Sequence, residues 1–78
     1  MRRDDPGVGS RARIVELLHS PARTRGHAAV LLGQYGTVVM VLRYGTVALL
    51  ELDADADELP GGARRWPVHW DDLQVYNT

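Results

Sequence analysis

The sequence contains no cysteine, no lysine and no phenylalanine among its 78 residues. Without cysteine the chain can form neither a disulfide nor a thiolate metal site, which fits a reducing compartment such as the cytoplasm. No apolar run reaches the roughly 18 residues of a membrane-spanning helix, and no apolar segment follows the charged start of the chain. We therefore expect a cytoplasmic protein that is neither exported nor embedded in a membrane.

Because lysine is absent, all nine basic residues are arginine, whose planar guanidinium is suited to bidentate contacts. Residues 1–45 hold seven arginines and three acidic residues, a balance of +4, whereas residues 46–78 hold two arginines and seven acidic residues, a balance of −5. Such a dipolar chain can orient itself on a charged partner. The net charge of −1 nevertheless argues against a dedicated nucleic-acid-binding protein.

Residues 32–52 carry the clearest structural signal, two segments rich in Val, Leu and Thr that are separated by Tyr44-Gly45. This pattern predicts a β-hairpin, because a hairpin turn needs a residue with positive φ and glycine adopts it without strain. A three-residue loop over 43–45 would place Leu42 opposite Thr46 and Val41 opposite Val47. In the same register Val39 lies opposite Leu49, and Thr37 lies opposite Glu51.

Both faces of this hairpin are apolar, although a small barrel has only one interior. The predicted interior face contains Val38, Met40, Leu42, Ala48, Leu50 and Leu52. The opposite face contains Val39, Val41, Val47 and Leu49, and an apolar outer face needs a cover. The cover is the chain's own 19–32 segment, another strand, or a second chain, which is either a partner protein or a second copy. We therefore predict Val39, Val41, Val47 and Leu49 as partner-binding residues.

The rest of the chain is consistent with a single small all-β domain over 10–78, preceded by a flexible arm over 1–9. Residues 11–18 fit either a first strand or a short helix capped by Ser10, and the strand is favoured because a barrel needs it. Residues 19–29 and 53–63 contain Pro and Gly and predict loops, and 65–76 predict two strands joined at Asp71-Asp72. The sum is a five-stranded SH3-like barrel, with a split β-roll as the alternative.

No pattern typical of a catalytic, cofactor or metal site is present. His19, His27 and His69 are far apart and lack cysteine partners, so we expect no zinc site. The run Asp53-Ala54-Asp55-Ala56-Asp57 resembles the start of a calcium loop, but Glu58 and Arg64 replace the glycine and glutamate that such a loop requires. We predict no cofactor, no metal and no catalytic residues, and whether the chain contributes to an enzyme is left open.

Two arginine-containing regions are candidates for binding. Arg23 and Arg25 lie two residues apart in a predicted loop and could grip a carboxylate or oxyanion of a partner, the alternative being a solvated loop. A nucleic-acid or ribosome-associated barrel is the second functional class. It would use five of the arginines outside this loop together with an aromatic residue, namely Arg2, Arg3, Arg11, Arg13 and Arg43 with Tyr44.

Four short motifs spread over residues 9–76 resemble the C-terminal SH3-like barrel of the nitrile hydratase β subunit. They are Gly9-Ser10-Arg11-Ala12-Arg13-Ile14, Ser20-Pro21-Ala22-Arg23-Thr24-Arg25, Gly33-Gln34-Tyr35-Gly36-Thr37-Val38 and Trp70-Asp71-Asp72-Leu73-Gln74. The photosystem I peripheral barrel subunit and the ferredoxin-thioredoxin reductase variable chain are similar in outline. Ala22 and Arg23 depart from the Gly and His of the family's loop motif, and the helical half of a β subunit has no counterpart.

The resemblance implies a noncatalytic accessory subunit that docks on a larger, metal-bearing subunit. In that family an arginine of the loop contacts oxidised cysteine ligands of the partner's metal, and Arg25 holds the corresponding position. The expected function is therefore a noncatalytic SH3-like binding or assembly module, and the resemblance implies an accessory subunit of a nitrile-hydratase-like lyase.

Overall fold

The computed structural model describes residues 7–76 and contains one antiparallel sheet in the order β4-β3-β2-β1-β5. Its strands are β1 (Arg11–Ile14), β2 (Tyr35–Leu42), β3 (Val47–Leu52), β4 (Arg65–His69) and β5 (Leu73–Tyr76). The helical segments are α1 (Ala22–Arg25), α2 (Ala28–Leu31) and the 3-10 turns η1 (Ala56–Glu58), η2 (Pro60–Gly62) and η3 (Trp70–Asp72). The predicted all-β class with five strands is confirmed, and the first strand covers the start of the ambiguous 11–18 segment.

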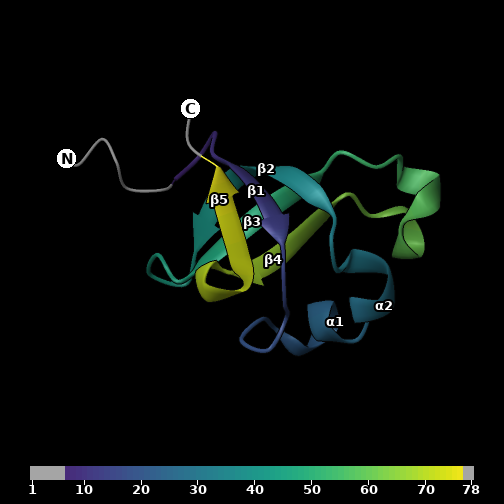
Figure 1. Cartoon of the computed structure of the whole chain (residues 1–78), viewed down its shortest axis with the longest axis horizontal. Coiled ribbons are helices and arrows are strands. Elements are labelled where there is room, and N and C mark those ends of the chain that lie inside the picture. Colours follow the sequence, from purple (N-terminus) through teal and green to yellow (C-terminus); the bar gives the residue numbers. More distant parts are fainter. Residues whose placement is uncertain (1–6, 77–78) are drawn as a thin grey trace.

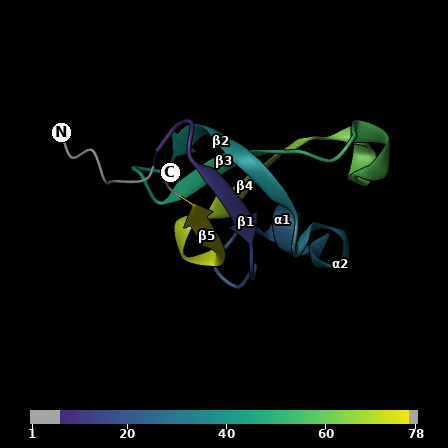
Figure 2. The ribbon, with the colours of Figure 1, turned by 45° about the horizontal axis from the view of Figure 1, so that its top comes forward.

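The sheet bends over itself, so that β1 and β5 cross in front of β3 and β4 (Figure 1); the turned view shows the same strands from another side (Figure 2). β5 pairs with β1 over four residues, and β4 pairs with β3 over five. Within residues 7–76 no backbone ladder joins β4 to β5, so closure of the sheet into a barrel is not found. The two strands are instead connected through η3.

The core lies between the two folded halves of the sheet. It is built from side chains of every strand, with Leu17, Leu31 and Leu59 added from the connecting segments. Its fully buried large members include Trp66, Ile14, Leu31, Leu50, Leu52, Val38 and Val68. A chain of this size buries a smaller fraction of its surface than a larger domain does, so each of these side chains is a large part of the total apolar burial.

The β2–β3 hairpin has a different register from the predicted one. Leu42 pairs with Val47 and Val41 pairs with Ala48, so the loop contains four residues rather than three. A β-bulge between Val38 and Met40 restores the predicted pairing of Thr37 with Glu51. Gly45 has the expected positive φ of 88°. The sequence pattern fixed the strands and the turn but could not reveal the bulge, which inserts one unpaired residue into β2.

The bulge exchanges the two faces of β2 beyond Val39, because side chains alternate with period two. Met40, predicted to lie inside, is 51% exposed, whereas Val41, predicted to lie outside, packs against the core. Val47 is buried as well, with 3% of its surface exposed. The prediction of a continuous apolar outer face made by Val39, Val41, Val47 and Leu49 is therefore wrong, because Val41 and Val47 pack inward. Val39 and Leu49 alone remain half-buried there without membership in the core cluster.

The connecting segments are more ordered than the predicted loops. Residues 19–29 contain α1 and the start of α2, and 53–63 contain η1 and η2. Leu31 and Leu59 are buried in the core, which explains why these segments are held against the sheet. Residues 1–6 of the predicted arm lie outside the described residues. Gly9 donates a backbone hydrogen bond to Val38 at 2.8 Å, so the end of that arm is joined to β2.

Gly36 is required at its place in β2 by the close approach of β3. A Cβ atom at this position would overlap the carbonyl oxygen of Glu51, and it would lie 3.0 Å from a side-chain atom of Leu50. Because the overlapping atom belongs to the backbone of a paired strand, a larger residue could be accommodated only by moving that strand.

Candidate functional site

An apolar groove lies between the segment that follows β1 and the α1–α2 pair. Its volume is about 360 Å³, and it is lined by Val15, Glu16, Leu17, Leu18, Arg25, Ala28 and Leu32. Three of these side chains are both apolar and largely exposed, with Leu18 74%, Leu32 47% and Val15 45% accessible. Exposed apolar side chains gathered in one concave surface are typical of binding sites, whereas scattered ones are ordinary.

The first wall of the groove is held in place by Asp72, which belongs to η3 just before β5. The backbone N–H groups of Val15 and Glu16 donate to the Asp72 carbonyl oxygen at 3.0 and 3.3 Å. Its Oδ2 accepts from the Ser20 hydroxyl at 2.6 Å and from the His19 N–H at 2.9 Å. Asp72 is completely buried. The backbone carbonyl of Asp72 therefore holds the start of the irregular segment 15–20, and its side chain holds the end.

The second wall is formed by two one-turn helices that depend on tertiary contacts, because helices of four residues are not stable by themselves. Thr24 of α1 is buried, and its hydroxyl donates to the Pro67 carbonyl of β4 at 2.8 Å. Leu31 of α2 is buried in the core. These two anchors hold α1 against β4 and α2 against the core, with both helices near the same end of the sheet (Figure 1).

Arg23 and Arg25 do not act as a pair. The Arg23 guanidinium lies over the Trp66 ring at 4.4 Å from its centroid, and Arg25 lines the groove. Because both residues belong to α1, a spacing of two places their side chains on different sides of the helix. The hypothesis of a double grip is therefore wrong, since it assumed a loop. Arg25 alone remains a candidate for contact with a partner's carboxylate or oxyanion.

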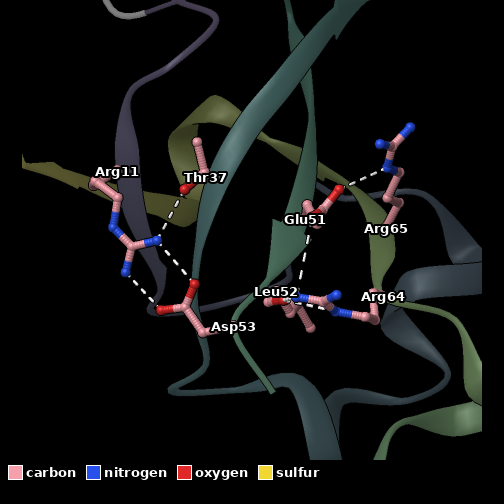
Figure 3. Close-up of polar contacts among 7 residues, drawn as sticks. All are labelled: Arg11, Thr37, Glu51, Leu52, Asp53, Arg64 and Arg65. Atoms are coloured by element: carbon pink, nitrogen blue, oxygen red, sulfur yellow. Dashed lines mark hydrogen bonds and ion pairs between the residues drawn. The ribbon is translucent and has the colours of Figure 1, made fainter. Parts of the chain in front are cut away.

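Several of the other arginines are engaged in contacts within the molecule (Figure 3). Arg11 donates to both carboxylate oxygens of Asp53, at 2.9 and 2.6 Å, and also to the Thr37 hydroxyl at 2.9 Å. Arg65 donates to Glu51 at 2.9 Å, and Arg64 donates to the Leu52 carbonyl. The acidic run that resembles a calcium loop thus begins with a carboxylate that is paired with arginine.

The Arg11–Asp53 contact makes stability depend on pH at the acidic end. The hydrogen bond from Arg11, together with its positive charge, lowers the pKa of Asp53 below its ordinary value of 3.8. A lowered pKa contributes stability that is present above pH 3.8 and is lost as the pH falls through the folded-state value. Both side chains are about half exposed, so we expect a contribution of only about 0.5 kcal/mol.

Urea unfolding of the wild type and of Asp53→Asn checks this prediction. The variant should be about 0.5 kcal/mol less stable near neutral pH, and the difference should shrink towards zero as the pH falls below 3.8 and through the lowered pKa of Asp53. A difference that stays constant over this range would show that the carboxylate charge is not its source.

A second candidate surface is aromatic and is formed by Tyr35 at the start of β2 and Tyr76 at the end of β5. The rings of Tyr35 and Tyr76 are stacked with centroids 6.1 Å apart, and Arg13 lies 5.8 Å from the centre of the Tyr35 ring. Both tyrosines are more than one third exposed.

Tyr44, the aromatic residue predicted to bind nucleic acid, is fully exposed at the hairpin loop. Arg2 and Arg3 lie outside the described residues, and Arg11 is paired with Asp53.

Comparisons of the chain with family models, with curated proteins and with solved structures found no match. The resemblance to the nitrile hydratase β subunit therefore stays a prediction. None of the helices within residues 7–76 is long and apolar enough to cross a membrane.

Proposed function

We propose that this chain is a noncatalytic binding module that docks on a larger protein through the groove of Val15, Leu18, Leu32 and Arg25. The observation that supports the proposal is the concave apolar surface itself, whose walls are held by buried anchors on both sides. A partner segment with apolar side chains and one carboxylate would match it. The apolar side chains would cover Leu18 and Leu32, and the carboxylate would meet Arg25.

This surface replaces the one expected from the hairpin, because burial of Val47 and packing of Val41 leave little of that face accessible. A partner contact through Val39 and Leu49 stays a prediction. The resemblance adds a more specific proposal, in which the larger protein is a metal-bearing subunit of the nitrile hydratase kind and Arg25 reaches its site. A cytoplasmic location agrees with both versions.

Capture from an extract of the source cells tests the docking proposal, with Leu18→Glu as the variant and Val8→Glu as its matched control. Leu18 lies in the groove, whereas Val8 is similarly exposed outside it. A partner captured by the wild type should bind Leu18→Glu at least about tenfold more weakly, since a charge at the centre of an apolar contact loses its hydration. Arg25→Ala should weaken the same partner, and circular dichroism should show all three variants folded.

Equal binding of the partner by Leu18→Glu and Val8→Glu would exclude the groove as the docking surface. A second copy of the chain as the only partner, seen as a doubled mass in solution, would exclude docking on a larger protein.

The aromatic surface favours nucleic-acid binding as the second candidate function. The stacked rings of Tyr35 and Tyr76 can hold unpaired bases, and the guanidinium of Arg13 beside them can contact the phosphate backbone of the nucleic acid. Titration with a single-stranded oligonucleotide at rising salt separates the two candidates. Binding through phosphates should weaken steeply with salt and should be reduced by Tyr35→Ala but not by Leu18→Glu.

A further inference from the structure

Three potential metal ligands from two distant parts of the sequence meet beside the groove, which Glu16 also lines. Glu16 and His19 belong to the segment after β1, and Asp72 belongs to η3. One carboxylate oxygen of each acid and one imidazole nitrogen of His19 all lie within 4.8 Å of one another. Asp72 is buried, Glu16 is half-buried and His19 is exposed, so the cluster extends from the interior to the surface.

The two carboxylate oxygens of Asp72 are in different situations. Oδ2 accepts the hydrogen bonds from Ser20 and from the His19 backbone. Oδ1 is buried and has no hydrogen-bond partner within residues 7–76. A buried carboxylate oxygen without a partner is costly, and native proteins normally provide it with a donor or a cation. This oxygen therefore has unused capacity as a ligand.

The side chains of Glu16 and His19 are available for a ligand role. Within residues 7–76 neither makes a side-chain hydrogen bond or an ion pair. Both have room to move, because one is half-buried and the other is exposed. Their approach to the buried carboxylate would bring three donor atoms to the separation of roughly 3.3 Å that follows from tetrahedral zinc bond lengths.

His69 lies beside the cluster but is not part of the donor set. Its ring centroid is 5.6 Å from that of His19. The Asp71 backbone N–H donates to Nδ1 of His69 at 3.1 Å, so a neutral His69 ring carries its proton on Nε2. Neither nitrogen then has a free lone pair for a metal ion. His19 is therefore the imidazole that can bind a cation here.

We propose that Glu16, His19 and Asp72 bind a divalent transition-metal ion of the zinc type, with water in the remaining positions. The imidazole nitrogen favours zinc over magnesium and calcium, which prefer shells made of oxygen ligands. The ion would compensate the buried Asp72 carboxylate and link both ends of the segment 15–20. This inference is independent of the docking proposal, because it does not require a partner protein.

Isothermal titration of the full chain with ZnCl₂ tests the site, with separate titrations of Mg²⁺ and Ca²⁺. We expect one Zn²⁺ ion per chain and no comparable binding of the other two ions. Glu16→Gln and His19→Ala should each weaken Zn²⁺ binding by about tenfold or more, since loss even of an outer-shell partner costs 10- to 100-fold. His27→Ala is the matched control, because it removes an exposed histidine outside the cluster and should leave the affinity unchanged.

Two further measurements make the result specific to this site. The imidazole signals of His19, but not those of His27, should shift in NMR spectra when Zn²⁺ is added. Affinity should fall as the solution is acidified, because protons compete with a metal ion for its ligands. Circular dichroism of each variant without metal checks that the fold is kept.

Several outcomes would overturn the proposal. They are the absence of Zn²⁺ binding, affinity that Glu16→Gln and His19→Ala leave unchanged, an equal loss in His27→Ala, and a preference for Mg²⁺ or Ca²⁺. Failure of the groove variants to affect a partner would reject the docking proposal and leave these metal titrations unaffected.

Discussion

Replacing Trp66 by alanine should lower the free energy of unfolding by about 3–5 kcal/mol, the usual range for removing a buried tryptophan. Trp66 is 1% exposed in β4, and its indole N–H donates to the Ala63 carbonyl at 2.8 Å. The ring also supports α1, since Arg23 lies over it at 4.4 Å. A domain of this size has a total stability of about 4–12 kcal/mol, so the variant should be partly unfolded near 37 °C.

Urea unfolding followed by far-UV circular dichroism measures this effect, with Trp70→Ala as the control. Trp70 is also a tryptophan packed against the core, but it is only partly buried, so its loss should cost less. Trp66→Phe should retain more of the stability by keeping an aromatic ring in the core. A larger loss for Trp70→Ala than for Trp66→Ala would contradict the placement of Trp66 at the centre of the core.

The second large effect is expected for Asp72→Ala, which should lose about 3 kcal/mol in metal-free buffer. Hydrogen bonds to a charged group contribute about 1.5–3 kcal/mol each, and this substitution removes two of them at once. It also leaves the Ser20 hydroxyl buried with one partner fewer. Because the same hydrogen bonds hold His19 and Ser20, this end of the groove wall should loosen together with the loss of stability.

Denaturant unfolding in the presence of EDTA measures the loss, with Asp71→Ala as the neighbouring control. The Asp71 side chain is exposed, so its removal should change the free energy of unfolding by less than about 0.5 kcal/mol. Asp72→Asn should lie between the two alanine variants, because an amide keeps one acceptor oxygen. Hydrogen exchange at the His19 N–H should become faster in Asp72→Ala, and an unchanged rate would contradict the anchoring role.

The sequence predicts the structural role of Trp66 better than that of Asp72. In a chain without phenylalanine, tryptophan and tyrosine must supply the large side chains of the core or its rim, and Trp66 is one of them. Asp72 was interpreted as half of a tight turn. Nothing in its neighbours predicts burial, since its partners are Ser20 and the backbone of the 15–20 segment, more than fifty positions away in the chain.

The sequence by itself determined the all-β class, the approximate strands and the turn at Gly45, because period-two patterns, β-branched residues and glycine act locally. Only the tertiary structure decided the β-bulge at Val39, and with it the side of the sheet to which Met40 and Val41 belong. It also decided the helical form of α1 and α2, which depends on anchors such as Thr24 and Leu31. The groove and the Glu16-His19-Asp72 cluster arise in the same way, because both depend on contacts between segments that only the folded chain brings together.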